Sequence, residues 1–185
     1  MTFALCHHPA HSPTISMAVE AGVAVQSDCA LVFSFHCRYQ PDEQSSINIL
    51  LPTPTAPVEC DNLWQHTCCE AFVSVPDAED YLEFNFSPSA CWATYRFDAY
   101  RVRDEAFVSP SAPKIELKQH AQGFDLTAMM SPAAILSNWP HPKTWLMGLS
   151  AVIETTDHHK SYWTIRHDAP KPDFHRRTQF LLPFN

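Results

Sequence analysis

Glycine is scarce in this chain: three of its 185 residues are glycine, whereas sixteen are proline. Phosphate-binding loops need closely spaced glycines, and the sequence has neither a Walker nor a Rossmann fingerprint. Proline argues against long helices, because it lacks a backbone donor and clashes inside a helix. Charged residues make up only 17% of the chain and hydrophobic residues 45%, which excludes an intrinsically disordered protein.

Positive charge is also in short supply. Twelve Lys and Arg residues against twenty Asp and Glu give a formal net charge of −8. Such a chain is a poor ligand for phosphate backbones and anionic lipid heads, so we expect no nucleic-acid partner and no membrane partner. Every apolar run is far shorter than the roughly 20 residues that a membrane-spanning helix needs. The sequence predicts no particular oligomeric state.

Motifs of catalysis, export and metal binding are missing as well. Neither G-x-S-x-G nor H-E-x-x-H occurs, and none of the seven cysteines forms a C-x-x-C pair. The N-terminus lacks the basic and apolar regions of a signal peptide. We therefore expect a cytoplasmic protein with reduced thiols, no catalytic residues, no metal and no cofactor.

What the sequence does contain is alternation of apolar and polar residues, which is typical of half-buried strands. One or two helical turns are expected only at Ala133–Ser137, after Ser-Pro. We predict an all-β protein, an antiparallel β-sandwich of jelly-roll or immunoglobulin-like type, as a single domain over 1–185 with a flexible tail at 1–13. The expected strands, about ten in all, are Thr14–Val25, Leu31–Tyr39, Ile47–Leu51, Ala71–Val75, Tyr81–Phe86, Trp92–Arg101, Lys114–His120, Phe124–Met130, Trp145–Glu154, Tyr162–His167 and Phe180–Phe184.

One sheet face is predicted to be chemically unusual. If residues 63–101 form a meander, one face carries the core rows Ala71, Val73 and Val75; Leu82, Phe84 and Phe86; and Ala93, Tyr95, Phe97 and Ala99. The opposite face then carries Glu70 and Phe72; Tyr81, Glu83 and Asn85; and Trp92, Thr94, Arg96 and Asp98. Aromatic rings beside fixed polar groups suit a sugar or another polar ring. The alternative is an ordinary solvated face on which Arg96 pairs with Glu83 or Asp98.

The order of aromatic residues resembles a known family. The segments that carry the resemblance are Leu63 to Phe72 (LWQHTCCEAF), Tyr81 to Pro88 (YLEFNFSP), Trp92 to Arg101 (WATYRFDAYR), Ser161 to His167 (SYWTIRH) and Lys171 to His175 (KPDFH). Together they resemble the bacterial DOMON-like proteins, which are related to the family 9 carbohydrate-binding modules. The resemblance implies a β-sandwich that binds a sugar or haem and catalyses nothing. It also implies roles for Trp64 as a clamping tryptophan, for Glu70 as an acid and for Arg96 as a sugar-reading arginine.

These observations lead to a specific hypothesis. The chain is predicted to be a non-catalytic module that binds a carbohydrate on an exposed sheet face, by stacking on Trp64 and Trp92. Polar contacts are expected from Glu70, Asn85 and Arg96. His175 either caps a ligand hydroxyl or locks the last strand through a backbone hydrogen bond. Trp163 shares a row with Ile165, which favours a place in the core.

Other interpretations remain open at this stage. Haem b binding would use Met17, Met129, Met130 or Met147 with His167 or His175, although Met147 fits plain core packing better. Cys6, His7, His8 and His11 could hold a transition metal or belong to the polar tail. A glycosidase pair of Glu70 and Glu83 has no motif to support it. A further interpretation is that the chain is a β-sandwich that binds another protein and holds no small ligand.

Overall fold

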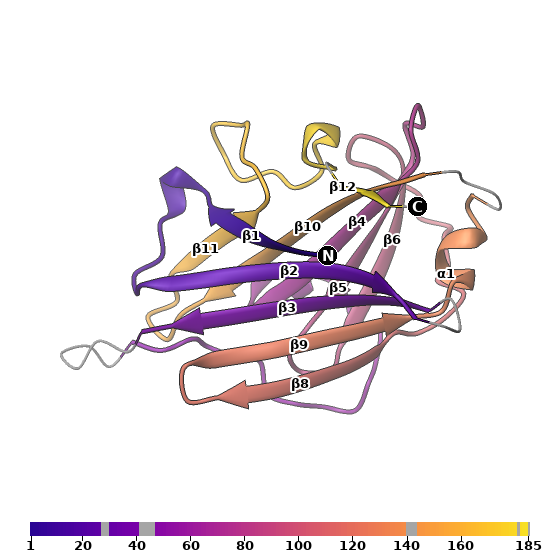
Figure 1. Cartoon of the computed structure of the whole chain (residues 1–185). Coiled ribbons are helices and arrows are strands. Elements are labelled where there is room, and N and C mark those ends of the chain that lie inside the picture. The colour runs from indigo at the N-terminus through magenta and orange to yellow at the C-terminus, as the bar shows by residue number, and fades with distance from the viewer. Residues whose placement is uncertain (27–29, 41–46, 140–143, 181, 185) are drawn as a thin grey trace.

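The structure is a computed structural model, and it describes residues 1–26, 30–40, 47–139, 144–180 and 182–184 (Figure 1). Only α1 (Ala133–Leu136) and three short 3-10 turns are helical in this part of the chain, and no described helix is long and apolar enough to cross a membrane. The strands are β1 (Thr2–His7), β2 (Met17–Val25), β3 (Leu31–Tyr39), β4 (Cys68–Ser74), β5 (Tyr81–Phe86), β6 (Trp92–Ala99), β7 (Val102–Arg103), β8 (Lys114–His120), β9 (Gly123–Met130), β10 (Trp145–Glu154), β11 (Lys160–Thr164) and β12 (Leu182–Phe184). The prediction of an antiparallel β-sandwich is confirmed.

Two layers face each other (Figure 1). Sheet A has the strand order β1–β2–β3–β9–β8, and sheet B has the order β7–β6–β5–β4–β10–β11–β1. Strand β1 belongs to both sheets, because Thr2–Leu5 pairs with β2 whereas Cys6 and His7 pair with β11. The short strand β12 pairs with the start of β10. The two sheets are therefore tied together through the first strand of the chain.

The main core lies between the sheets and is rich in phenylalanine. Phe33 of β3 lies over Phe84 and Phe86 of β5, with ring centroids 6.3 and 5.8 Å apart. The predicted core row of β5 is confirmed, since Leu82, Phe84 and Phe86 are all fully buried. Trp163 and Met147 also belong to this core, as expected from the sequence. Removal of such rings from water is the main favourable term in folding.

The outer face of sheet B is not solvated, because the chain that follows β11 folds back over it. Phe174 and Phe180 of this segment pack with Phe72, Tyr81 and Phe97 in a second apolar cluster. Every residue of β4 and β5 is buried as a result. Sheet B therefore has the main core on one face and the C-terminal segment on the other, and this second layer shapes the candidate site.

Several sequence-based predictions are corrected at the edges of the fold. Residues 1–13 are not a flexible tail, since Thr2–His7 forms β1 and the Leu5 side chain lies in the core. The expected strand Ile47–Leu51 is reduced to a bridge between Ile49 and Thr155, and β11 ends at Thr164. Only Leu5 of β1 is buried, so local alternation was too weak to reveal a strand that pairs with residues distant in sequence.

Candidate functional site

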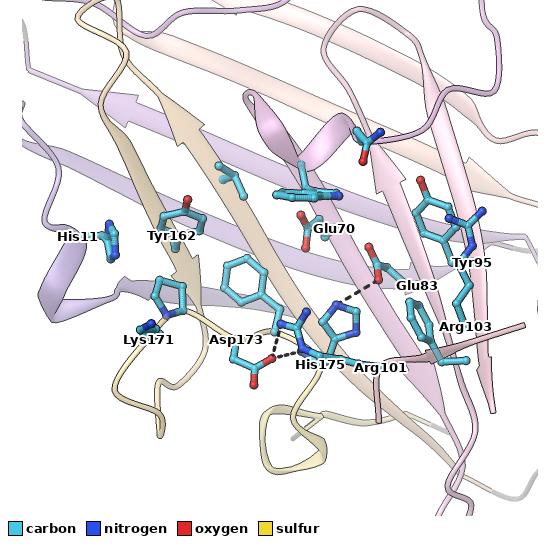
Figure 2. A pocket seen from close by; sticks show the side chains of 16 residues that line it. His11, Glu70, Glu83, Tyr95, Arg101, Arg103, Tyr162, Lys171, Asp173 and His175 are labelled. Carbon is cyan, nitrogen blue, oxygen red and sulfur yellow. Dashed lines mark hydrogen bonds and ion pairs between the residues drawn. The ribbon is translucent and has the colours of Figure 1, made fainter. Parts of the chain in front are cut away.

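A cavity of about 490 Å³ lies on the outer face of sheet B (Figure 2). Strands of sheet B form its floor, and the C-terminal segment forms one wall. Its lining combines aromatic side chains, carboxyl groups and cations: His11, Asn62, Trp64, Glu70, Glu83, Tyr95, Phe97, Arg101, Arg103, Val152, Tyr162, Lys171, Pro172, Asp173, Phe174 and His175. The polar groups come from several strands and from the segments that connect or follow them rather than from one motif.

Two carboxyl groups lie at the floor of the cavity. Glu70 of β4 is opposite Asn85 of β5, and Glu83 is opposite Phe72, so the two acids are diagonal neighbours on one sheet face. Their residues are 3% and 4% exposed. Ser150 Oγ donates to Glu70 Oε2 at 3.4 Å, and Asn85 Nδ2 donates to Glu83 Oε1 at 2.6 Å. The second oxygen of Glu83 has no hydrogen-bond partner in the described part of the chain.

Burial changes the acidity of both groups. Desolvation raises the pKa of Glu83 from 4.5 to about 7, although Asn85, Arg101 and Arg103 act in the opposite direction. The pKa of Glu70 is raised well above its ordinary value, first by burial and then by the charge of Glu83. The pair consequently retains a proton near neutral pH. It can donate a hydrogen bond to a ligand as well as accept one.

His175 connects the C-terminal segment to this floor. Its Nδ1 lies 2.8 Å from the Tyr81 hydroxyl, which accepts a hydrogen bond from the Arg101 backbone N–H at 3.1 Å. Its Nε2 lies 3.7 Å from Glu83 Oε2. Burial and then the positive charge of Arg101 lower the pKa of His175 to about 4, so the ring is neutral at pH 7. The ring bonds a side-chain hydroxyl rather than the backbone, and it also lines the cavity.

Aromatic side chains surround the carboxyl pair. Trp64 stands at the rim with 49% of its surface exposed, and the rings of Tyr95 and Tyr162 lie on either side of Glu70 in Figure 2. The Tyr95 hydroxyl donates to Asp61 at 2.8 Å, which fixes that ring. Flat apolar faces beside fixed polar groups are the arrangement that polar ring-shaped ligands need.

Three of the six predicted site residues line the cavity, namely Trp64, Glu70 and His175. Asn85 lies on the same sheet face, where it holds Glu83, but it is not part of the cavity lining. Its own carbonyl oxygen accepts a hydrogen bond from the Cys68 thiol at 3.5 Å. Asn85 is therefore placed to orient an acid rather than to touch a ligand.

The predicted placement of Trp92 and Arg96 on this face is wrong. Trp92 is opposite Phe86 and Arg96 is opposite Leu82, so both point to the side of the main core. Arg96 forms ion pairs with Asp98 at 3.3 Å and Asp104 at 3.1 Å, and not with Glu83. The apolar row of β6 was assigned to the main core because of its hydrophobicity. Burial by the C-terminal segment, rather than by the other sheet, explains that hydrophobicity.

The residues missed by sequence analysis include Tyr95, Phe97, Arg101 and Arg103. The short loop over 87–91 could have located the first two. It makes Phe86 and Trp92 the closing pair of a hairpin, and directly opposed residues share a face. That rule places Tyr95 beside Glu83. No comparable local pattern marks the two arginines.

The residues considered for haem or metal are dispersed. Met130 and Met147 lie in the core between the sheets, whereas His175 lies on the outer face of sheet B. His8 accepts a hydrogen bond from the Ala10 backbone N–H and lies 3.0 Å from the Ala169 carbonyl oxygen. Within the described residues, no group of three or more His, Cys, Asp or Glu is arranged to hold a metal ion.

Comparison with known proteins gives a fold and no family. No protein-family model matches the chain, and no curated protein matches its sequence. Its fold is similar to that of a "putative carbohydrate-binding protein" from Bacteroides uniformis ATCC 8492, with a TM-score of 0.66 and 11% identity. The similarity covers 98% of this chain and 84% of that one. At this identity it shows a shared β-sandwich architecture alone.

Proposed function

We propose that this chain is a non-catalytic binding module that holds a small carbohydrate in the cavity on the outer face of sheet B. The observation that carries the proposal is the pair of buried carboxyl groups, Glu70 and Glu83, at the floor of a cavity with aromatic walls. A sugar hydroxyl both donates and accepts hydrogen bonds, and a carboxyl pair that retains a proton offers both partners. A sugar ring also has apolar C–H surfaces that stack on aromatic faces.

Two further observations agree with a small carbohydrate as the ligand. The cavity of about 490 Å³ lies within the range of roughly 300–1,000 Å³ typical of small-molecule sites. The sandwich resembles that of a "putative carbohydrate-binding protein". The order of aromatic residues also resembles that of the DOMON-like proteins and the family 9 carbohydrate-binding modules. In this proposal Trp64 stacks on the ligand, Glu70 and Glu83 bond its hydroxyls, and Asn85 holds Glu83 in place.

The test is calorimetric titration of the purified protein with a panel of monosaccharides and disaccharides. Trp64→Ala is expected to weaken binding about tenfold, since loss of a stacking ring removes roughly 1–1.5 kcal/mol. Trp64 is half exposed, so the substitution should leave the fold intact. Val108→Ala, at an apolar position that is 81% exposed and outside the cavity lining, is the control and should bind as the parent does.

Three results would contradict this proposal. One is the absence of binding to every sugar in the panel. A second is equal affinity of the parent and Trp64→Ala for a sugar that does bind. The third is a Soret band that sharpens when haemin is added, which would favour the haem alternative.

A further inference from the structure

The cavity lining holds three of the chain's few cations, together with the carboxyl groups of Glu70, Glu83 and Asp173. Of the twelve Lys and Arg residues, Arg101, Arg103 and Lys171 line this one cavity. The formal net charge of the chain is −8. Cations gathered in a concave site raise the local concentration of anions, even where the whole protein repels them.

The three cations differ in how they are paired. Arg101 Nη2 bonds Asp173 at 2.8 Å, so its charge is matched. Arg103 lies over the Tyr95 ring at 4.3 Å and is 3.5 Å from Asp61 and from Glu105. Lys171 is exposed, and its ammonium group forms no ion pair or hydrogen bond within the described residues. Lys171 is thus the lining cation that has no acidic partner there.

The position of Lys171 relative to the floor suits a two-point contact. Figure 2 shows Lys171 and His11 at one end of the cavity, Arg103 at the opposite end, and Glu70 between them. Tyr162 lines the same cavity as Lys171, and His11 packs against the Tyr162 ring with centroids 5.1 Å apart. A ligand that fills the cavity would contact both the floor acids and Lys171, since they line it together.

The two floor acids do not cancel this positive end. Burial raises the pKa of both acids, that of Glu83 to about 7, so the floor carries less negative charge at pH 6 than two ordinary carboxylates would. The groups that face them are Arg101 and Arg103 from the β6–β7 region and His175 from the C-terminal segment. A negatively charged ligand would therefore meet hydrogen-bond donors at the floor rather than two carboxylates.

We infer that the ligand is an acidic sugar, whose carboxylate pairs with Lys171 while its ring hydroxyls meet Glu70 and Glu83. This inference rests on the proposed carbohydrate-binding function and makes it more specific. A carboxylate beside an ammonium group forms a charge-assisted hydrogen bond, which also selects against neutral sugars of the same shape. The chemistry fits a free uronic acid or a uronate at the end of an oligosaccharide.

Titration of matched sugar pairs at pH 6 tests the inference. Galacturonate and glucuronate are compared with galactose and glucose, first in low salt and then in 0.5 M salt, which shortens the screening length to roughly 4–5 Å. We expect the uronates to bind about tenfold more tightly in low salt, with a smaller preference in high salt. Lys171→Gln should reduce the ratio of the two affinities to about one, and Lys171→Arg should retain most of it.

Lys118→Gln is the matched control, because Lys118 is an exposed lysine of β8 in sheet A. It should keep the parent's preference for uronates. Equal affinities for uronates and neutral sugars, or an unchanged ratio in Lys171→Gln, would overturn the inference and leave carbohydrate binding intact. If Arg103→Gln abolished the preference for uronates and Lys171→Gln did not, the assignment to Lys171 would be overturned. Failure of all the sugars to bind would instead contradict the proposed function itself.

A uronate-terminated disaccharide separates the two sources of the ligand. Tighter binding of the disaccharide than of the free uronic acid, lost in Lys171→Gln, supports a terminal uronate of an oligosaccharide. Tighter binding of the free uronic acid than of the disaccharide, again lost in Lys171→Gln, supports a free sugar acid as the ligand. Disaccharide binding that is insensitive to Lys171→Gln would contradict the inference for that source.

Discussion

Phe84→Ala is expected to lower the free energy of unfolding by about 3–5 kcal/mol, which is the range for removal of a buried aromatic ring from a packed core. Phe84 is fully buried between the sheets, with Phe33 across the core and Phe86 next to it on the same strand face. Main-chain pairing on both sides of β5 limits how far the strand can move to fill the cavity left behind. Urea denaturation followed by tryptophan fluorescence measures this change.

Val108→Ala serves as the reference for this experiment. Val108 is 81% exposed, so its truncation should change stability by no more than about 0.5 kcal/mol. A loss below about 1 kcal/mol in Phe84→Ala would mean that Phe84 does not face the core. In that case the register of β5 would be shifted by one residue, and Glu83 would no longer face the cavity.

Glu83→Gln is expected to stabilise the protein by about 3 kcal/mol above pH 7 and to have little effect below pH 4. The pKa of Glu83 is raised from 4.5 in the ordinary state to about 7 in the fold. Between these two values the unfolded chain has lost the proton while the folded chain still holds it, so stability falls as pH rises. Glutamine never ionises and its oxygen can still accept the bond from Asn85, which removes this cost.

The free energies of unfolding of the parent and of Glu83→Gln, measured at pH 4 and pH 8, give the effect of Glu83 ionisation on stability. Glu20→Gln, at an exposed position of β2, is the control and should differ from the parent by no more than about 0.5 kcal/mol at either pH. Glu83→Gln that is destabilising at pH 8 would show that Glu83 is ionised in the fold and held by Arg101 and Arg103. The same variant should also retain the shape of the cavity, because the side-chain volume hardly changes.

Part of the site was predictable because it depends on strand alternation alone. Glu70 and Glu83 lie on adjacent strands joined by a short connection, and their apolar neighbours Ala71 and Phe84 mark the opposite face. A period of two places alternate side chains on opposite faces with no need for distant contacts. The same reasoning identified the phenylalanine core of β5 and the all-β class.

The side of the sheet on which β6 presents its apolar row could not be predicted from alternation. Alternation shows that two faces differ, but it does not show which face meets the other sheet. Tyr95 and Phe97 are covered by Phe174 and His175, so their hydrophobicity resembled that of core residues. Only the hairpin register separates them from Trp92 and Arg96.

The sequence by itself determined the sandwich architecture, the core rows of its clearest strands and the presence of acids and aromatic residues on neighbouring strands. The tertiary structure decided that these groups share a cavity with Arg101 and Lys171, which are seventy positions apart in the chain. It also decided that the first strand joins the two sheets. The physical reason is that alternation is a local property, whereas the folding of the C-terminal segment over sheet B depends on contacts between residues far apart in sequence.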